Sequence, residues 1–396
     1  MSLPLENVRI LAVSQFGAGP FGAMMLADLG AEVLKIEDPS TGGDVSRYVP
    51  PYTIDRDSVY FQSFNRNNRS ITLNLKTQDG KAIFHRLVAR SDAVLSNLRG
   101  DSWRRLGMDY ESLKAVNPKI VCCALTAYGT TGPRAAEAGY DYLVQAYAGY
   151  MSITGTPDGP PERCGVSIID HAAGFAAALG LVAAVLHARE TGVGCDVDVA
   201  LLDTAISMLT YLAAWSLNHD YQPQRMNGSA HQTLVPVQTF RTRDSYLVLF
   251  CGKERFWQEL CVLLEAPELA EDPRFRTFKL RYQNREAVLD LIQELLLGRT
   301  TKEWVTLLQG KVPCAPVNTI AQGLSDPQVL ARGMIVEVDH PTFGRLREVG
   351  SPIKIAGEDH PRAPAPALGQ DTHAILREEL GYSDDEIARL QAAGAI

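Results

Sequence analysis

The sequence has few of the features that mark membrane, secreted or nucleic-acid-binding proteins. Its 38 basic residues are outnumbered by 46 acidic residues, which gives a net charge of −8, whereas duplex binding requires a basic face. The longest apolar run, Ala172–Leu186, is shorter than the roughly 18 to 20 residues that cross a bilayer. No charged leader precedes an apolar block at the N-terminus. We therefore expect a cytoplasmic protein without a nucleic-acid or membrane partner.

Cysteine is present but follows no pattern. The seven cysteines form no CxxC pair and show no spacing with histidine that is typical of a zinc site. Reduced thiols in the cytoplasm fit this usage, so we expect neither a disulfide framework nor a metal site. The 46% apolar and 21% charged composition is that of a globular protein. A chain of 396 residues allows two or three domains.

Short apolar runs alternate with helical periodicity in the first half of the chain. Strands are expected at 8–13, 31–37, 70–75, 93–96, 120–127 and 196–201, and helices at 21–29, 79–89, 171–187 and 202–217. This alternation predicts an α/β fold with a doubly wound parallel sheet. Residues 42–69 interrupt it with a polar, aromatic, proline-containing stretch, which we interpret as an ordered functional loop.

Residues 233–325 have a different pattern. Two strand-like runs around Arg243-Asp244 predict a hairpin. Helical stretches follow at 253–264, 284–297 and 301–309. We interpret this region as a smaller α+β domain.

The first expected turn carries a glycine motif. Gly17, Gly19 and Gly22 form G-x-G-x-x-G between a strand and a helix, and Glu37 lies twenty residues beyond Gly17. This is the context of a dinucleotide-binding fingerprint, but no helix and strand follow Glu37 at the expected spacing. Three interpretations stay open: a dinucleotide cofactor, another phosphate-bearing ligand, or a structural turn.

Asp170 carries the most specific chemical hypothesis. The apolar run before it is expected to be a strand that ends on Asp170, and an Ala/Gly-rich helix is expected to begin just after it. A carboxylate at a helix N-terminus faces unpaired N–H groups, which predicts a lowered pKa and an ionised side chain. The small residues that follow leave room for a bulky group, as covalent catalysis by a carboxylate requires. The alternative is an ordinary N-cap.

Other polar residues are candidates for the same site. His171 is either a base or a structural histidine, and Tyr140-Asp141 opens a helix that Asp141 could cap. Arginine forks suit phosphate, the alternative being a solvated surface. The arginines that cluster in this part of the sequence are Arg66, Arg69, Arg99, Arg104 and Arg105.

Several motifs together match one known family. They occupy residues 18–20, 26–33, 35–37, 65–76, 139–145, 152–160 and 380–390, together with the segment that ends in Asp170. With these motifs the chain resembles the class III CoA-transferases (the CaiB/BaiF family) nearly from end to end. The resemblance implies a Rossmann-like large domain of residues 1–220 plus 330–396. It also implies a small domain of residues 221–329 and an interlocked homodimer.

The resemblance further implies an acyl-CoA:carboxylate CoA-transferase. Asp170 would be the nucleophile, working through an aspartyl anhydride and an aspartyl-CoA thioester, with a short dicarboxylate as donor or acceptor acid. CoA thioesters would be substrates, and no metal or permanently bound cofactor is implied. The residues implied to contact CoA are Ala18, Leu73, Asn97, Arg105, Tyr140 and Asp141.

The sequence departs from parts of this family at several positions. Asp38 stands where formyl-CoA transferases carry a basic residue, and Leu98 replaces an aromatic residue. Residues 251–255 contain one glycine where those enzymes have a glycine-rich lid, which favours an acid other than oxalate. The α-methylacyl-CoA racemases are similar too, and a racemase or epimerase is the alternative function. Those enzymes carry His-Asp where this sequence has Tyr140-Asp141.

Overall fold

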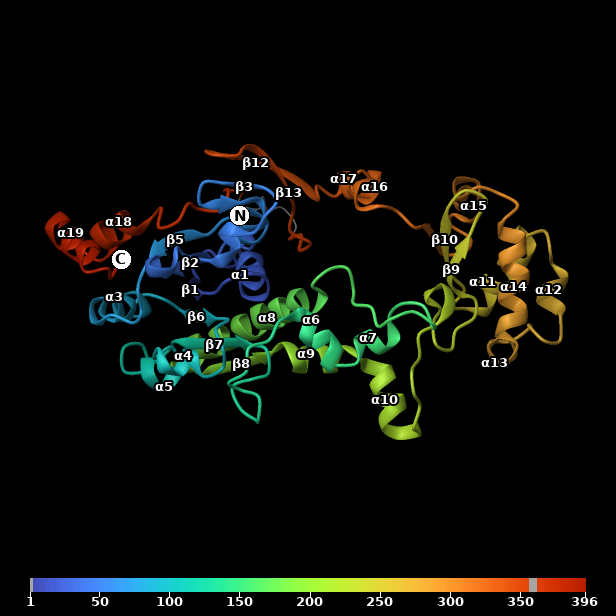
Figure 1. The fold of residues 1–396 in the computed structure, drawn as a ribbon, viewed down its shortest axis with the longest axis horizontal. Helices are drawn as coiled ribbons and strands as arrows, with labels where there is room; N and C mark the ends of the chain where they lie inside the picture. Colours follow the sequence, from blue (N-terminus) through green and yellow to red (C-terminus); the bar gives the residue numbers. More distant parts are fainter. Residues whose placement is uncertain (1–2, 356–361) are drawn as a thin grey trace. The chain divides into compact units, whose positions relative to one another are not determined.

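The structure, a computed structural model, describes residues 3–355 and 362–396 (Figure 1). They form two compact units, one from residues 1–148, 165–210 and 327–396, the other from 149–164 and 211–326. The predicted boundaries, 1–220 plus 330–396 and 221–329, differ from these units at residues 149–164, 211–220 and 327–329. One reason is that the Arg225 guanidinium donates to the carbonyl oxygens of Gly159 and Pro160, which ties the early segment to the second unit.

A six-stranded parallel sheet forms the centre of the first unit. Its strands are β1 (Arg9–Val13), β2 (Glu32–Glu37), β5 (Arg69–Thr72), β6 (Ala93–Ser96), β7 (Val121–Thr126) and β8 (Asp196–Ala200). Their spatial order is β5-β2-β1-β6-β7-β8, and every neighbouring pair is parallel. This confirms the predicted α/β fold with a central parallel sheet. The order reverses between β1 and β6, and ligands of open parallel sheets bind outside the carboxyl ends of the strands at such a point.

Helix α8 (Ile168–Thr191) packs against α1 (Ala18–Asp28) and against β7. Its 24 residues are long and apolar enough to cross a membrane by length and composition. One stripe, which includes Ala173, Ala177 and Leu181, is buried in the first unit. A second stripe at spacings of four and seven, Phe175, Leu179 and Leu186, is exposed. The apolar run predicted as a core helix is therefore buried on one side only.

The segment predicted as a loop at 42–69 contains regular structure. It follows the turn η1 (Pro39–Thr41) and forms the turn η2 (Val45–Tyr48), the strands β3 (Thr53–Ile54) and β4 (Asp57–Ser58), and helix α2 (Val59–Asn65). Part of the segment is buried against the sheet: Arg47 is 1% exposed and donates two hydrogen bonds to Glu37 at the end of β2. The segment therefore belongs to the fold of the first unit.

The C-terminal part of the chain completes the first unit. The hairpin β12 (Ile335–His340) and β13 (Gly344–Val349) was not predicted. The last helices are α18 (Thr372–Ala374), η4 (Ile375–Glu379) and α19 (Asp384–Ala392). Their apolar residues, such as Leu376 and Leu390, belong to the same buried cluster as Leu11 of β1.

The second unit has its own core. Strands β9 (Val237–Arg241), β10 (Tyr246–Phe250) and β11 (Cys314–Pro316) form an antiparallel sheet. Its principal helices are α11 (Glu254–Leu263), α14 (Arg285–Leu296) and α15 (Thr301–Leu308), close to the predicted positions. Trp257, Ile292 and Leu308 are buried among them.

The remaining elements are helices and turns of at most 11 residues. They are α3 (Gln78–Val88), α4 (Ser102–Arg105), α5 (Tyr110–Leu113), α6 (Asp141–Tyr147), α7 (Tyr150–Ile153), α9 (Leu201–Met208), α10 (Thr210–His219), η3 (Asn227–Ser229), α12 (Glu268–Glu271), α13 (Phe278–Gln283), α16 (Ile320–Leu324) and α17 (Pro327–Ala331). The single helix predicted at 202–217 is divided into α9 and α10, because Thr210 has a positive φ of 45°.

Candidate active site

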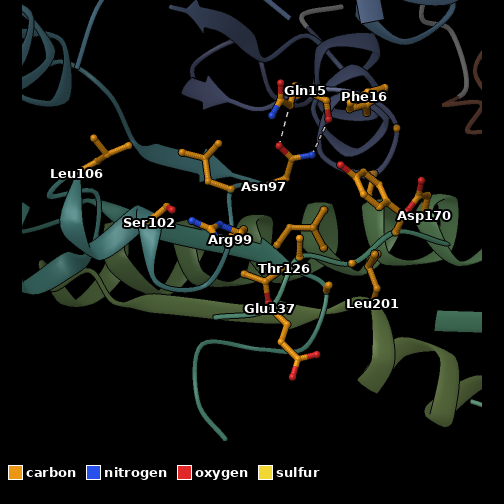
Figure 2. Close-up of a pocket in the computed structure, with 18 of the residues that line it drawn as sticks. Gln15, Phe16, Asn97, Arg99, Ser102, Leu106, Thr126, Glu137, Asp170 and Leu201 are labelled. Atoms are coloured by element: carbon orange, nitrogen blue, oxygen red, sulfur yellow. Dashed lines mark hydrogen bonds between the residues drawn. The ribbon is translucent and has the colours of Figure 1, made fainter. Parts of the chain in front are cut away.

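A cavity of about 600 Å³ lies at the carboxyl ends of β1, β6 and β7 (Figure 2). It is lined by Gln15–Ala18 after β1, by Asn97–Arg99 after β6, and by Thr126 at the end of β7. Tyr140 and Asp170 complete the lining at the starts of α6 and α8. This is the switch point of the sheet, and open parallel sheets bind their ligands at such a point.

A second cavity of about 410 Å³ adjoins the first. Both are lined by Gln15, Lys76, Leu98 and Leu106. The second extends toward the end of β2, where Asp38 and Leu73 line it. The two cavities thus offer a long ligand a path that starts at Asp170 and ends beyond β2.

The structure brings most of the predicted site residues together. Ala18, Asn97, Arg105, Tyr140 and Asp170 line the first cavity, and Leu73 lines the second. Asp141 is 2% exposed and lines neither of these two cavities of the described residues. Its contact with CoA stays a prediction.

The turn after β1 is fixed by Asn97. The Asn97 Oδ1 atom accepts from the Gln15 N–H at 2.9 Å, and its Nδ2 atom donates to the Gln15 carbonyl oxygen at 2.6 Å (Figure 2). Both backbone groups of Gln15 are thus satisfied by one side chain from the neighbouring strand end. Asn97 therefore shapes the cavity wall as well as lining it.

Asp170 lies in a different element from the one predicted. The run expected as a strand is the start of α8, which begins at Ile168 with Ser167 as the N-cap residue. The Asp141 Oδ2 atom accepts from the N–H groups of Ile169 at 2.8 Å and Asp170 at 3.3 Å. Asp141 therefore caps α8 from α6, and not the helix that it opens. A short apolar run fits one helical turn as well as a strand, which is why the sequence misled here.

The prediction of a lowered Asp170 pKa was wrong. Burial, and secondly the negative charge of Asp141, raise the pKa of Asp170 to about 7. The helix N–H groups that were expected to stabilise the Asp170 carboxylate are instead bonded to Asp141. A neighbouring like charge and a lost hydration shell both favour the protonated form.

The glycine motif is explained by close contacts within the protein. A Cβ atom on Gly17 would lie 2.8 Å from the Asp170 Oδ2 atom, so only glycine leaves room for that carboxylate. A Cβ atom on Gly22 would lie 2.7 Å from the carbonyl oxygen of Gly174, where α1 crosses α8. Gly19 faces Ser14 and Asn97 equally closely. These contacts favour the structural interpretation of the motif.

The predicted arginine cluster is divided by the fold. Arg66 is buried and bonds to Asp28, while Arg69 pairs with Glu32 and Glu379. Arg99 and Arg105, in contrast, line the first cavity and remain largely exposed. Their side chains flank Asp101 at 3.8 and 3.6 Å.

Lys76 was missed by the sequence analysis. It lines both cavities, and its Nζ atom lies 3.0 Å from the Asp38 Oδ2 atom. Its place at the end of the 65–76 motif, soon after β5, was the available indication. Phe16 and Glu137 also line the first cavity and were missed, since neither stands in a recognisable pattern.

His171 has the place of a structural residue. Its ring lies against Phe21, with centroids 4.7 Å apart, and stacks on Phe64 at 6.0 Å. Burial lowers its pKa, so the imidazole is neutral at pH 7. Among the described residues, no group of three His, Cys, Asp or Glu side chains is placed to hold a metal ion.

The fold and the site define an α/β enzyme whose cleft opens at the switch point of a parallel sheet. The sequence profile of CoA-transferase family III matches residues 5–372. The chain is 38% identical to a succinyl-CoA:glutarate CoA-transferase of Mus musculus, over 99% of this chain and 90% of that protein. It is 35% identical to a succinate–glutarate CoA-transferase of Agrobacterium fabrum, over 95% of each.

Solved structures agree with the sequence relatives. A CaiB/BaiF family protein from Brucella suis superposes with a TM-score of 0.82 at 34% identity, covering 96% of this chain and 100% of that one. The chain therefore belongs to CoA-transferase family III, as its motifs indicated, and is a CoA-transferase.

Proposed function

We propose that this enzyme moves CoA from an acyl-CoA thioester to a carboxylic acid, with a short dicarboxylate as donor or acceptor. The observation that carries the proposal is the Asp170 carboxylate, which lines a 600 Å³ cavity at the switch point and faces a glycine. Relatives named succinyl-CoA:glutarate and succinyl-CoA:mesaconate CoA-transferase support the dicarboxylate.

The first half-reaction releases the donor acid. An oxygen of ionised Asp170 attacks the thioester carbonyl, the C–S bond breaks, and an aspartyl anhydride and CoA thiolate form. The thiolate then attacks the aspartyl carbonyl and breaks the anhydride C–O bond. The donor leaves as a carboxylate, and CoA is held as an aspartyl-CoA thioester.

The second half-reaction reverses these steps with the acceptor. Its carboxylate attacks the aspartyl thioester, which gives a second anhydride and CoA thiolate. The thiolate attacks the acceptor carbonyl, and the new acyl-CoA leaves while Asp170 recovers both oxygens. No net proton is consumed, and the energy of the thioester bond is kept in an activated acyl group throughout.

We propose that CoA binds along the two adjoining cavities of a Rossmann-like domain. The thioester end lies at Asp170, beside Ala18, Asn97 and Tyr140. The phosphates lie within reach of Arg105, whose planar fork suits a phosphate. The adenosine end extends past Leu73. CoA is a substrate in this scheme, and the chain's own carboxylate supplies the covalent chemistry.

We also propose that two copies of the chain associate in an interlocked homodimer. Support comes from α8, whose exposed stripe holds Phe175, Leu179 and Leu186 at 40%, 73% and 64% exposure. Exposure of large apolar side chains to water is unfavourable, and contact with a second copy would bury them. The association would take place in the cytoplasm.

Trapping of the covalent species tests the mechanism. Incubation with succinyl-CoA and hydroxylamine is expected to give a hydroxamate on Asp170 alone, detected by mass spectrometry of the digested protein. Asp170→Ala should remove both the adduct and transfer to glutarate. Asp203→Asn, in α9, is the matched control and should leave both unchanged. Deuterium exchange at the α-carbon of a 2-methylacyl-CoA, without transfer, would point to the racemase instead.

A further inference from the structure

We propose that the buried ion pair Lys35–Asp44 positions the turn Ser14–Gly17 against the nucleophile. Asp44 lines the second cavity, but its carboxylate is bonded to Lys35 and to the turn, so we assign both members of the pair as positioning residues for the transfer reaction. The inference rests on the proposed function, because it assigns the pair a part in the attack by Asp170.

Lys35 fixes the first residue of this turn. It stands on β2, next to β1, with its side chain 1% exposed. Its Nζ atom donates to the Ser14 carbonyl oxygen at 2.8 Å and to the Asp44 Oδ2 atom at 2.7 Å. The ammonium group therefore holds the chain where it leaves β1.

Asp44 fixes the third residue. Its Oδ1 atom accepts from the Phe16 N–H at 3.2 Å and from the Ser46 N–H at 2.8 Å. Phe16 has a φ of 62°, the left-handed region that side chains other than those of glycine, asparagine and aspartate rarely adopt. Such a conformation persists only where surrounding contacts enforce it. The Asp44 carboxylate is one of these contacts.

Asp44 is itself held by a second buried pair. Its backbone N–H donates to the Glu37 Oε2 atom at 3.1 Å, and Glu37 accepts two hydrogen bonds from Arg47. The turn is thus tied to β2 through Lys35 and through Glu37. With Asn97 bonded to Gln15, the backbone of the turn is held at three successive residues.

The position of this turn matters because it forms the wall that faces Asp170. Gly17 follows Phe16 directly and lies so close to the Asp170 Oδ2 atom that a Cβ atom would clash. Phe16 also meets the ring of Tyr140 edge-on, with centroids 6.2 Å apart. If the turn shifts, the space in which the thioester carbonyl meets the carboxylate changes. Misplacement by about 1 Å can slow a reaction about a hundredfold.

Neutralising both partners is the informative variant. Removal of one charge leaves the other buried and unpaired, which destabilises the protein, whereas removal of both is often nearly neutral. Lys35→Met with Asp44→Asn keeps an acceptor for the Phe16 N–H but removes the donor to Ser14. The turn then loses its fixed position without a buried unpaired charge.

The chain offers a matched control. Arg66 and Asp28 form another buried pair of the first unit at 2.5 Å, and Arg66 also donates to a backbone oxygen, that of Val349. Arg66→Met with Asp28→Asn removes the same two charges from a place that lines neither of the two cavities described above. Glu348 lies 3.8 Å from Arg66, but burial raises the pKa of Glu348 to about 7, so it takes up a proton when Arg66 is removed. Any loss common to both double variants therefore reports general loosening of the fold.

The experiment compares both double variants with the wild type. It measures unfolding temperature, kcat and KM for transfer from succinyl-CoA to glutarate, and the single-turnover rate of the Asp170 adduct with succinyl-CoA alone. For Lys35→Met/Asp44→Asn we expect kcat and the adduct rate to fall about ten- to a hundredfold, with the KM for succinyl-CoA nearly unchanged. The control pair should keep kcat within about twofold, since it bonds to no part of the site.

Unchanged kcat in Lys35→Met/Asp44→Asn would overturn the inference, as would an equal loss in the control pair. If that double variant does not fold, Lys35→Gln with Asp44→Asn replaces it, because this variant also leaves no buried charge unpaired, and wild-type kcat in it has the same meaning. If the wild type transfers CoA without any Asp170 adduct, the proposed mechanism fails. If the wild type forms the adduct and Lys35→Met/Asp44→Asn keeps the wild-type kcat, the positioning inference fails while the proposed mechanism stands.

Discussion

At the scale of single residues, two carboxylates decide the chemistry of the site. Asp141 uses its charge to cap α8, and that charge also opposes ionisation of Asp170. A carboxylate with a pKa near 7 is a stronger base than an ordinary one, so its ionised form is a better nucleophile toward a thioester. It is still ionised in about half of the molecules at pH 7.

This arrangement predicts the pH dependence of the reaction. Because the proposed attack requires the ionised form of Asp170, kcat/KM should rise as the pH increases through about 7. Asp141→Asn removes the neighbouring charge and should move this rise to lower pH. Glu137→Gln removes a carboxylate that lines the cavity but does not raise the Asp170 pKa, and should leave it in place. If the pH dependence of kcat/KM is the same in Asp141→Asn as in the wild type, Asp141 does not raise the pKa of Asp170.

The same pKa predicts that the Asp170 carboxylate destabilises the fold. Asp170 binds a proton more tightly in the folded state, so its contribution to stability is present at low pH and is lost as the pH rises through about 7. Asp170→Asn should therefore raise the unfolding temperature above that of the wild type at pH 8. The difference should shrink toward pH 4, where the wild-type carboxyl is protonated. Calorimetry at the two pH values measures it, and equal differences would argue against the raised pKa.

At the scale of elements, the crossing of α1 and α8 holds the site together. Gly22 and Gly174 face each other there without side chains. Asp170 lies one turn before Gly174 on the same helix, so this crossing sets the distance from the carboxylate to Gly17. The strands that end at the site are fixed in turn by their parallel register.

Gly22→Ala is expected to be costly. Its Cβ atom would lie 2.7 Å from the Gly174 carbonyl oxygen, and backbone cannot give way as a side chain can. We expect a loss of about 1 to 3 kcal/mol in the free energy of unfolding, measured by urea denaturation. Gly323→Ala, a helical position of α16 with open space around it, should be neutral or slightly stabilising. Equal stability of the two variants would refute close packing at the crossing.

Elements were predicted well where periodicity was long and poorly where it was short. The strands of the sheet and the hairpin of the second unit were found because apolar runs and turn residues bracket them. Residues 165–170 were assigned to a strand because a run of this length also fits a helical turn. The hairpin Ile335–Val349 was missed although charged residues alternate with apolar ones along its strands, because the sequence analysis relied on continuous apolar runs.

At the scale of the whole molecule, the exposed stripe of α8 predicts self-association. Leu179→Asp places a charge at its most exposed position and should convert a dimer into monomers in sedimentation velocity. Val262→Asp, at an exposed apolar position of α11 in the second unit, should leave the dimer intact. A wild type that sediments as a monomer at micromolar concentration would overturn the homodimer.

The sequence by itself determined the family, the parallel sheet and the nucleophile candidate, because these depend on local motifs and on periodicity. Its resemblance to the family also pointed to Ala18, Asn97 and Arg105 as residues of one site, and all three line the same cavity. Only the tertiary structure showed that the pKa of Asp170 is raised, that Asp141 caps α8, and that Lys35 bonds to Ser14 and Asp44. Those properties depend on groups brought together from distant parts of the chain, and a pKa or a backbone turn responds to the nearest charges in space.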